Sequence, residues 1–396
     1  MPSENLVSQA VESCKQSKVC FSKFISANDS GETGGHQTGI YIPKNSIELI
    51  FDRACEKGNN IDRNATIRWQ GESGFETESR FIYYGKKTRN EYRITKFGRG
   101  FDLLNKNSTG DLFVLAKMAE DYYEAFMFET DEDIENFLSA FGMSPTDTNA
   151  LINVTNKIDE KGKMASIFME FIKVSGKSFP STEKIASEAR RIVELIGKSG
   201  NKQLSMKDPD KTILSWLDTE YSLFKAMENY HYSSYLKKPF DSVETLIHVA
   251  NEMLNRRKSR AGWSLEHHLC SIFDYNELKY DYQAKTEKNK KPDFIFPGIT
   301  YYFEDKYSDK LVFLASKTTC KDRWRQILNE ADRIKTKHLF TLQQGISSNQ
   351  LEEMEDQNVV LVCPEQYVST FPGKYRSKIL SLQKFIAFTK NKTAIL

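Results

Sequence analysis

The sequence predicts two folded domains of different class, a mostly-β domain at the N-terminus and an α/β domain at the C-terminus. Its 396 residues exceed what one hydrophobic core usually organises, and the length suggests roughly two or three domains. Short strand-like segments fill the first part of the chain, whereas helical patterns and then alternating strands and helices follow residue 182. This change of pattern indicates a domain boundary.

The N-terminal region contains five segments with the composition of strands. Each alternates β-branched or aromatic residues with polar ones and is bounded by Gly, Asn or Asp. This spacing predicts an all-β, barrel-like unit, and the segments at 131–143 and 149–158 then have a helical pattern. The five strand segments are TGIYIPK (38–44), ATIRWQG (65–71), RFIYYG (80–85), YRITKFGRG (92–100) and GDLFVLAKM (110–118).

The segment KVSGKSFPST has the Ser, Gly and Pro content of a hinge. We therefore predict an N-terminal domain over residues 1–172, a linker over 173–182 and a C-terminal domain over 183–396.

The C-terminal region begins with helices and continues as an alternation of strands and helices. A Ser/Thr cap and an early glutamate predict a helix that starts at residue 181, and helical patterns continue over 211–273. Strands joined by single helices form right-handed crossovers, which predicts a largely parallel α/β sheet. The predicted strands are PDFIFPG (292–298), KLVFLAS (310–316), HLFTLQ (338–343) and NVVLVCP (358–364), with helices at 321–336 and 347–356.

Composition excludes some classes of protein and favours others. No apolar stretch approaches the ~20 residues that span a bilayer, and the N-terminus lacks the pattern of a secretory signal. Six cysteines without a C-x-x-C pair argue against a zinc site and a disulfide scaffold, so we expect reduced thiols in a cytoplasmic protein.

The net charge of +2 conceals three basic clusters that lie beside aromatic residues. Such clusters are often only solvated surface, but three of them also suggest a polyanionic partner. They are YYGKKTRNEYR (83–93), NRRKSR (255–260) and KTEKNKK (285–291).

Three residues of the C-terminal region have the pattern of a nuclease active site. Asp293 opens a short strand, Lys317 ends the next one, and Glu330 lies on the predicted helix that follows, off its buried stripe. Two acids can hold Mg²⁺ through oxygen ligands, while a lysine orients or deprotonates water and offsets charge on a phosphate. The pattern indicates metal-dependent phosphodiester cleavage.

Each of these residues also has a plainer interpretation. A Pro-Asp pair is usually a turn, a lysine that ends a strand can simply reach water, and a glutamate at the border of a helix is usually solvated. The helix itself is expected to be anchored by a buried stripe of Trp324, Ile327, Leu328, Ala331 and Ile334.

Long runs of the C-terminal region resemble the EcoRII-type restriction endonucleases, which are members of the PD-(D/E)XK nuclease superfamily. The resemblance implies a C-terminal α/β restriction-endonuclease-like domain. It is carried by RRKSRAGWSLEHHL (256–269), KKPDFIFPG (290–298) and LASKTTCKDRWRQILNEADRIKTKHLFTLQQGIS (314–347).

Two runs near the front resemble the N-terminal effector domain of that family, a mostly-β pseudobarrel similar to plant DNA-binding domains. They are SANDSGETGGHQTGIYIP (26–43) and KTRNEYRITKFGRG (87–100). The DNA-contacting positions of that domain are matched here by His36, Tyr41, Lys87, Arg89, Glu91 and Arg93.

The resemblance assigns Asp293, Lys317 and Glu330 as catalytic residues, with Mg²⁺ held by Asp293 and Glu330. Ala315 stands where the common motif has an acid, which fits a branch of the superfamily in which the acid moves to the helix. Glu266 matches an acid that supports the metal site, although a surface role is an alternative.

The same resemblance implies that Lys321, Asp322 and Arg323 read C·G base pairs in the major groove. Arginine and lysine donate to guanine N7 and O6, and aspartate accepts from cytosine N4. The implied target is a short palindrome with CC and GG on either side of one base pair, CCWGG or CCNGG.

The resemblance therefore implies a Mg²⁺-dependent type II restriction endonuclease that cleaves double-stranded DNA and leaves 5′-phosphates. It also implies a homodimer, activation by a second copy of the site, and a cognate methyltransferase in a restriction-modification system. By the same resemblance, the N-terminal domain is autoinhibitory, so deletion of residues 1 to about 178 is expected to raise cleavage of single-site DNA.

Two other functions stay open from the sequence alone. One is a non-catalytic DNA-binding regulator, which has no reason to keep Asp293, Lys317 and Glu330 together. The other is a structure-specific DNA repair nuclease, which would not need a base-reading Lys-Asp-Arg segment.

Overall fold

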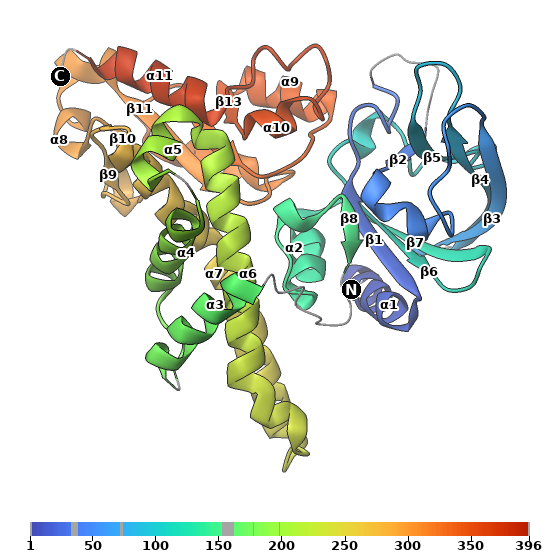
Figure 1. The fold of residues 1–396 in the computed structure, drawn as a ribbon. Helices are drawn as coiled ribbons and strands as arrows, with labels where there is room; N and C mark the ends of the chain where they lie inside the picture. The colour runs from blue at the N-terminus through green and yellow to red at the C-terminus, as the bar shows by residue number, and fades with distance from the viewer. Residues whose placement is uncertain are drawn as a thin grey trace. The chain divides into compact units, whose positions relative to one another are not determined.

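The computed structural model describes residues 2–32, 39–71, 74–152, 162–176, 178–197 and 199–394 (Figure 1). Two compact units make up the chain. The first unit contains residues 1–156, 343–355 and 367–377, and the second contains 157–342, 356–366 and 378–396. Each unit combines several separate stretches of the chain, whereas the predicted domains are continuous. The predicted boundaries at 172 and 183 therefore remain a prediction.

The first unit is built on a sheet in the order β2-β5-β4-β3-β7-β6-β1-β8. Neighbouring strands are antiparallel, except that β3 and β7 are parallel, with Thr66 opposite Tyr122. The strands are β1 Val19–Phe24, β2 Ile40–Ile42, β3 Ile61–Trp69, β4 Phe75–Tyr84, β5 Glu91–Thr95, β6 Leu112–Lys117, β7 Tyr122–Phe128 and β8 Ala150–Ile152.

Two hydrophobic cores hold this sheet. One surrounds the buried indole of Trp69, which packs against Phe97, Phe101 and Phe113. The other forms between the strands and two helices, α1 (Pro2–Gln16) and α2 (Asp131–Ala140). Short 3-10 helices connect the remaining segments at Lys44–Leu49, Lys106–Ser108 and Pro145–Asp147.

Most sequence predictions for this unit are confirmed, including all five strand segments and the helix at 131–143. The helix predicted at 149–158 is wrong for residues 150–152, which form β8, because their backbone groups pair with β1. Residues 153–158 lie outside the described residues. Strands β1 and β7 were not predicted.

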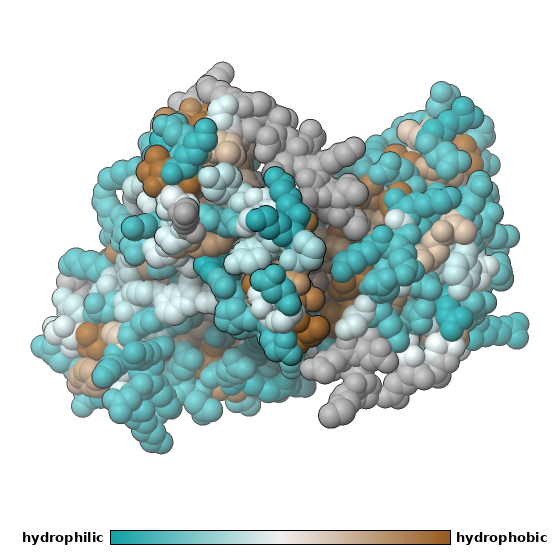
Figure 2. Space-filling model, turned by 90° about the horizontal axis from the view of Figure 1, so that it is seen from below, coloured by the Kyte–Doolittle hydropathy of each residue, from teal (hydrophilic) through white to brown (hydrophobic). Residues whose placement is uncertain are grey.

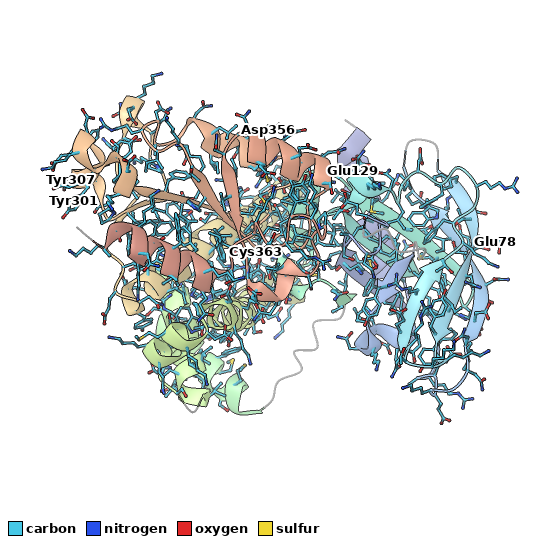
Figure 3. All side chains as sticks on the ribbon, turned by 90° about the horizontal axis from the view of Figure 1, so that it is seen from above. Glu78, Glu129, Tyr301, Tyr307, Asp356 and Cys363 are labelled. Carbon is cyan, nitrogen blue, oxygen red and sulfur yellow. A yellow bond between two sulfur atoms is a disulfide. The ribbon has the colours of Figure 1, made fainter. Side chains whose placement is uncertain are left out.

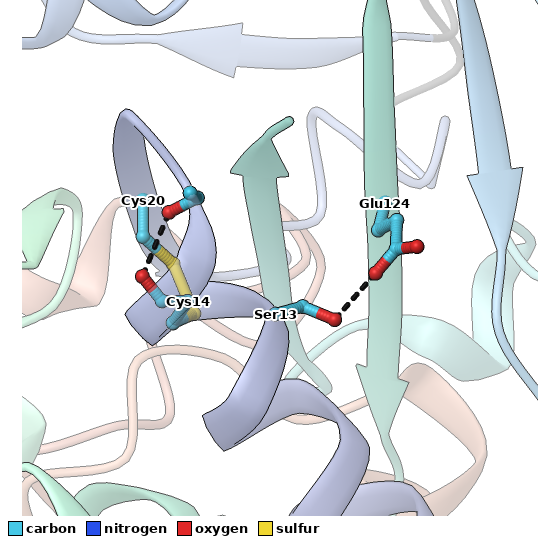
Figure 4. Close-up of a disulfide and its surroundings, with 5 residues drawn as sticks. Ser13, Cys14, Cys20 and Glu124 are labelled. Carbon is cyan, nitrogen blue, oxygen red and sulfur yellow. Dashed lines mark hydrogen bonds between the residues drawn. A yellow bond between two sulfur atoms is a disulfide. The ribbon is translucent and has the colours of Figure 1, made fainter. Parts of the chain in front are cut away.

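A disulfide joins Cys14 at the end of α1 to Cys20 in β1 (Figure 4). Next to it, the hydroxyl of Ser13 donates to the carboxylate of Glu124 in β7. The expectation of reduced thiols is therefore wrong for this pair, because the turn between helix and strand brings the two side chains together. The remaining cysteines (Cys55, Cys270, Cys320 and Cys363) are free thiols.

Two segments from the last part of the chain complete the first unit. The Nε2 of Gln343 donates to the carbonyl oxygen of Gly110 at 2.8 Å. The N–H of Ala27 donates to the carbonyl oxygen of Thr370 at 2.9 Å. Gly110 has a φ of 94°, and a Cβ there would lie 2.3 Å from the carbonyl oxygen of Gly345. This close approach of two backbones requires glycine.

The second unit begins with a bundle of five helices. A core of Phe168, Ile172, Ile185, Ile192, Leu223, Phe224, Ala226 and Met227 joins α3, α4 and α6. The long helices α6 and α7 lie side by side (Figure 1). The helices are α3 Gly162–Ser175, α4 Thr182–Ile196, α5 Asn201–Lys207, α6 Pro209–Lys237 and α7 Val243–Tyr275.

A buried polar network fixes α7 against α6. The carboxylate of Glu220 on α6 accepts hydrogen bonds from Arg260 at 3.1 Å and Ser264 at 2.6 Å, both on α7. His268 also contacts this carboxylate, with 2.8 Å between Nε2 and Oε2. Because these charges are paired inside the bundle, the rotation of α7 about its axis is well determined.

The sheet of the second unit has the order β13-β12-β11-β10-β9. The pairs β11–β12 and β12–β13 are parallel. The pairs β9–β10 and β10–β11 are antiparallel. The strands are β9 Asp281–Tyr282, β10 Phe294–Phe296, β11 Val312–Lys317, β12 Lys337–Thr341 and β13 Val359–Val362, with helices α8 Ile299–Tyr302, α9 Ser348–Asp356, α10 Glu365–Val368 and α11 Leu382–Thr393.

The prediction of a largely parallel sheet is therefore wrong for half of the strand pairs. The connection from β10 to β11 contains only the four-residue helix α8 and a short 3-10 helix, Asp305–Lys310. These elements do not form a crossover, so β11 returns antiparallel to β10. In this connection the rings of Tyr301 and Tyr307 pack edge to face, with 5.2 Å between the ring centres (Figure 3).

The helix predicted over 321–336 is also corrected. Only Arg323–Asn329 is helical, and it is a 3-10 helix. Glu330 follows in an extended conformation, and Ala331 has a φ of 48°. Trp324, Ile327, Ala331 and Ile334 are buried as predicted, whereas Leu328 is only half-buried. The apolar pattern thus identified the buried residues but not the conformation, because tertiary packing can bury residues of an irregular segment at the same spacing.

The face of the molecule in Figure 2 is mostly hydrophilic, with small separate hydrophobic patches. Among the described residues, no helix is both long and apolar enough to span a bilayer.

Candidate active site

The site is centred on Asp293, which directly precedes β10. The backbone N–H and the hydroxyl of Ser316 in β11 donate to its Oδ2 at 2.8 and 3.2 Å. Burial raises the pKa of Asp293, and the hydrogen bonds from Ser316 and the charge of Lys317 oppose this shift. Antiparallel pairing of β10 and β11 thus fixes one oxygen of the carboxylate.

Lys317 is the last residue of β11, as predicted. It follows Ser316 directly and is half-buried. Its charge lowers the pKa of Asp293, Glu330 and Glu266, so its ammonium acts on all three carboxylates. Strand β11 therefore places one positively charged side chain close to three carboxylates.

Glu330 reaches the same place from the segment that follows the 3-10 helix. Burial raises its pKa to about 7, and the charge of Asp293 adds to the shift. Lys317, Lys337 and Lys290 act in the opposite direction. A buried acid whose ionisation is opposed by a second carboxylate is typical of a functional site. The predicted trio of Asp293, Lys317 and Glu330 thus comes together, although Glu330 does not lie on a helix.

Glu266 joins this group from α7. Its Oε2 accepts from the hydroxyl of Tyr282 at 2.5 Å and from Nε2 of Gln283 at 3.1 Å. Burial and the charge of Asp293 raise its pKa, while these two hydrogen bonds and Lys317 lower it. Glu266 is therefore oriented by partners on and beside β9, and it is not simply a surface residue.

The donor set fits a Mg²⁺ ion. Within the part of the chain that the structure describes, no three His, Cys, Asp or Glu side chains are arranged to hold a metal ion by themselves. Mg²⁺ commonly takes only one or two carboxylates together with water and substrate phosphate. Asp293 and Glu330 provide two carboxylates whose mutual repulsion a cation would relieve, and the bonds from Ser316 all reach a single oxygen of Asp293.

The three predicted base-reading residues differ in exposure. Lys321 is buried, Asp322 is exposed and Arg323 is half-buried at the start of the 3-10 helix. Burial lowers the pKa of Lys321 to about 8, and Asp322 acts in the opposite direction. Trp324 is buried, as predicted for an anchor beneath this segment.

Three of the predicted DNA-contacting residues, Tyr41, Glu91 and Arg93, lie on the edge strand β2 or on its neighbour β5. Tyr41 in β2 is opposite Arg93 in β5, and Nε of Arg93 lies 3.5 Å from the carboxylate of Glu91. Arg93 also donates to the carbonyl oxygen of Gly39 at 3.0 Å, and it is buried. Three of the six predicted residues thus lie on the two strands at this edge.

Arg89 is exposed, and its guanidinium lies 5.1 Å from the centre of the Tyr84 ring. Lys87 is exposed in the turn between β4 and β5. His36 lies outside the described residues.

The sequence analysis missed four residues of the site, and only one of them leaves a signal in the sequence. Lys337 places a charge at the start of the apolar strand β12, where burial lowers its pKa to about 8. Ser316, Tyr282 and Gln283 have no distinctive spacing, because their roles depend on hydrogen bonds between distant segments.

Two protein-family models match separate parts of the chain. The one described as restriction endonuclease EcoRII, N-terminal, matches residues 14–149, and the one described as EcoRII C terminal matches residues 224–386. A curated relative, the type II restriction enzyme EcoRII of Escherichia coli, is 36% identical over 388 residues, which cover 92% of each chain. The chain belongs to the EcoRII family of type II restriction enzymes. This EcoRII-family protein is a site-specific deoxyribonuclease that binds and cleaves DNA.

Family membership also confirms the predicted fold class. The first unit contains the N-terminal pseudobarrel of the EcoRII family together with two segments of the C-terminal match, 343–355 and 367–377, and the second contains the C-terminal α/β endonuclease fold. The alternative of a non-catalytic regulator is excluded by the same finding.

Solved structures are similar to parts of this EcoRII-family chain. Metal-depleted Ecl18kI in complex with uncleaved, modified DNA has a TM-score of 0.46 and 18% identity, and the match covers 59% of this chain and 85% of that one. A complex of restriction endonuclease PspGI with substrate DNA has a TM-score of 0.45 and 16% identity, with coverage of 55% and 95%.

Proposed function

We propose that this restriction enzyme is Mg²⁺-dependent and cleaves double-stranded DNA at a palindromic CCWGG or CCNGG site. The observation that carries the catalytic part is the convergence of Asp293, Lys317 and Glu330, with the pKa of Glu330 raised to about 7 by burial and by Asp293. An acid pair beside one lysine is the arrangement that phosphodiester hydrolysis needs.

In the proposed mechanism, Asp293 and Glu330 hold Mg²⁺, which would stabilise charge on the phosphate and lower the pKa of bound water. Lys317 orients or deprotonates the attacking water and offsets the charge that develops on the non-bridging oxygens. Glu266, oriented by Tyr282 and Gln283, supports this site at its α7 side.

Water attacks phosphorus in line with the leaving oxygen. A new P–O bond forms, the bond between phosphorus and the 3′-oxygen breaks, and a proton goes to that oxygen. The products are a 5′-phosphate and a 3′-hydroxyl.

Recognition is assigned to Lys321, Asp322 and Arg323. Donation to guanine and acceptance from cytosine would each contribute ~1–3 kcal/mol of discrimination. Because these residues lie between Lys317 and Glu330 in the chain, base contacts, the lysine and one acid of the site would share one short segment. Lys321, which is buried here, would have to become accessible when DNA binds.

The first unit is proposed to bind a second copy of the site through Tyr41, Lys87, Arg89, Glu91 and Arg93, together with His36. It would inhibit the catalytic part until that copy is bound. The palindromic target implies a homodimer in the active complex. A cytoplasmic location and a cognate DNA methyltransferase in the host complete this proposal.

The test is digestion of plasmid DNA with the purified protein and Mg²⁺, followed by sequencing of the ends. Fixed ends within CCWGG or CCNGG, with 5′-phosphates, are expected. Scattered ends would indicate a structure-specific nuclease, and cleavage that persists in EDTA would contradict the metal dependence.

A further inference from the structure

Glu330 directly follows the 3-10 helix, to which its N–H donates at 3.1 Å through the carbonyl oxygen of Ile327. The 3-10 helix ends at Asn329, Glu330 is extended with φ −95° and ψ 145°, and Ala331 adopts a φ of 48°. A left-handed alanine is unfavourable by itself and persists only where neighbouring groups hold it. Other contacts must therefore fix the position of Glu330.

Lys337 makes the contact that reaches this point. It is the first residue of β12, opposite Phe313 of β11, and only 5% of its surface is exposed. Its Nζ donates to the carbonyl oxygen of Ala331 at 2.6 Å and also to the carbonyl oxygen of Glu330. The Nζ of Lys337 also lies over the ring of Phe313, 5.0 Å from its centre, and this cation–π contact favours the same position of the ammonium.

Two other contacts hold the chain further on. The hydroxyl of Tyr302 accepts from the N–H of Arg333 at 3.2 Å, and Lys290 forms an ion pair with Asp332 at 2.9 Å. Of these three contacts, the one from Lys337 is the contact that bonds to residue 330 itself.

This arrangement differs from that of the other acid in the pair. Asp293 is fixed by strand pairing, since its neighbour Phe294 lies in β10 and Ser316 of β11 bonds to its carboxylate. Glu330 has no strand of its own. Lys337 provides the missing link to the sheet, because its own backbone is held by both β11 and β13.

We propose that Lys337 is a positioning residue that ties the backbone of Glu330 to the central sheet and so places its carboxylate beside Asp293. Lys337 does not touch the substrate; it acts through Glu330. The inference rests on the proposed function, in which Asp293 and Glu330 hold the metal ion.

The decisive variant is Lys337→Met, which keeps the length of the side chain and removes the donors. The matched control is Lys335→Met, which removes the same charge from an exposed position two residues away. Lys337→Gln keeps two donors on a shorter side chain. Each full-length variant is compared with the wild type for Mn²⁺ binding, observed as loss of the free-ion signal in electron paramagnetic resonance.

Residues that orient a metal ligand typically affect metal affinity or activity ~10–100-fold. We expect Lys337→Met to weaken Mn²⁺ binding and to raise the Mg²⁺ concentration for half-maximal plasmid cleavage by about that factor. Binding of DNA in EDTA and the circular dichroism spectrum should stay as in the wild type. Lys335→Met should match the wild type in all of these measurements.

Unchanged Mn²⁺ affinity and Mg²⁺ dependence in Lys337→Met would overturn the proposal. So would a parallel loss of metal binding and DNA binding, because it would show a general structural role. If Lys337→Met does not fold, Lys337→Gln decides, since the shorter amide cannot reach both carbonyls; wild-type metal affinity in that variant also overturns the proposal.

Asp293→Ala separates this inference from the function on which it rests. If Asp293→Ala leaves Mn²⁺ binding intact, the assigned metal site is wrong. If Asp293→Ala loses Mn²⁺ while Lys337→Met keeps it, the site stands and only the role of Lys337 fails.

Discussion

Ser316 holds Asp293 by two donors, its backbone N–H and its hydroxyl, and both reach Oδ2. The two residues belong to segments 23 positions apart that become neighbours only when β10 pairs with β11. Since the shorter of the two bonds comes from the backbone, at 2.8 Å against 3.2 Å, the orientation of the carboxylate depends more on the strand than on the side chain of Ser316.

Asp293→Ala is expected to abolish cleavage while DNA binding persists. The variant removes one of two carboxylates for the metal, and a loss of several kcal/mol of transition-state stabilisation lowers the rate by about 10³-fold or more. Plasmid cleavage and DNA binding by fluorescence anisotropy measure the two properties. Asp309→Ala, which removes an exposed acid of the same unit, is the control and should cleave normally. Full activity in Asp293→Ala would remove this residue from the site.

Tyr282→Phe is expected to lower the rate of cleavage about 10-fold, because it removes the hydroxyl that donates to Glu266 at 2.5 Å. Gln283 still donates at 3.1 Å, so the loss should be partial. The control is Tyr280→Phe, which removes a hydroxyl that donates to Asp274 at 2.9 Å. Equal rates for both variants and the wild type would assign Glu266 no supporting role.

Glu330 is expected to contribute stability to the metal-free protein that is lost as pH rises from about 4.5 to about 7. Glu330 keeps its proton in the folded state up to a pKa of about 7, whereas the unfolded state releases it near the ordinary glutamate pKa of 4.5. Between these values the folded state binds more protons, so the free energy of unfolding decreases with pH and levels off above 7.

Urea unfolding in EDTA at several pH values measures this slope. Glu330→Gln should reduce the dependence of the free energy of unfolding on pH. The part of this dependence that comes from Asp293 and Glu266 should remain, because their pKa values are also raised. An identical slope in wild type and Glu330→Gln would mean that Glu330 ionises normally.

Arg89→Ala is expected to weaken DNA binding by the first unit. If Arg89 contacts one phosphate, the variant should reduce the dependence of log K on log salt by about 1 and reduce the stimulation of cleavage by a second site. Arg53→Ala, another exposed arginine of this unit, is the control with the same change of charge. The proposal for this edge fails if both variants behave alike.

Gly110→Ala is expected to destabilise the first unit by ~1–3 kcal/mol and to raise cleavage of single-site DNA. Its φ is 94°, and the added Cβ would lie 2.3 Å from the carbonyl oxygen of Gly345. Gly98→Ala is the matched control, because Gly98 has a φ of 92° and nothing lies within 4 Å of an added Cβ. A less stable Gly110→Ala protein that still requires a second site would contradict autoinhibition by this unit.

The sequence predicted the class of both domains because local patterns carry that information. Alternation identified strands β2 to β6, a helical pattern identified α2, and a capping residue helped to identify α4. Strand β8 was mistaken for a helix because an apolar run of three residues has no period of its own. Its conformation is decided by pairing with β1, from far away in the chain.

Asp293, Lys317 and Glu330 were predicted as a catalytic trio from motif positions, but the residues that contact and orient them were not predicted. Lys337, Ser316 and Tyr282 act through contacts across the sheet or between sheet and helix, and no spacing in the sequence reports these. The helix assigned to Glu330 failed for the same reason. Its apolar period is satisfied by a 3-10 helix and an irregular segment whose shape is held from outside.

The first unit takes in residues 343–355 and 367–377, and this has a consequence for how the protein is made. Ile346, Leu351 and Phe371 are buried side chains from these segments. During translation the N-terminal strands are synthesised first. Their unit can be completed only after residues 343–355 and 367–377 have been synthesised, near the end of the chain. A cut or a truncation between residues 156 and 178 would likewise leave these apolar side chains behind on the wrong fragment.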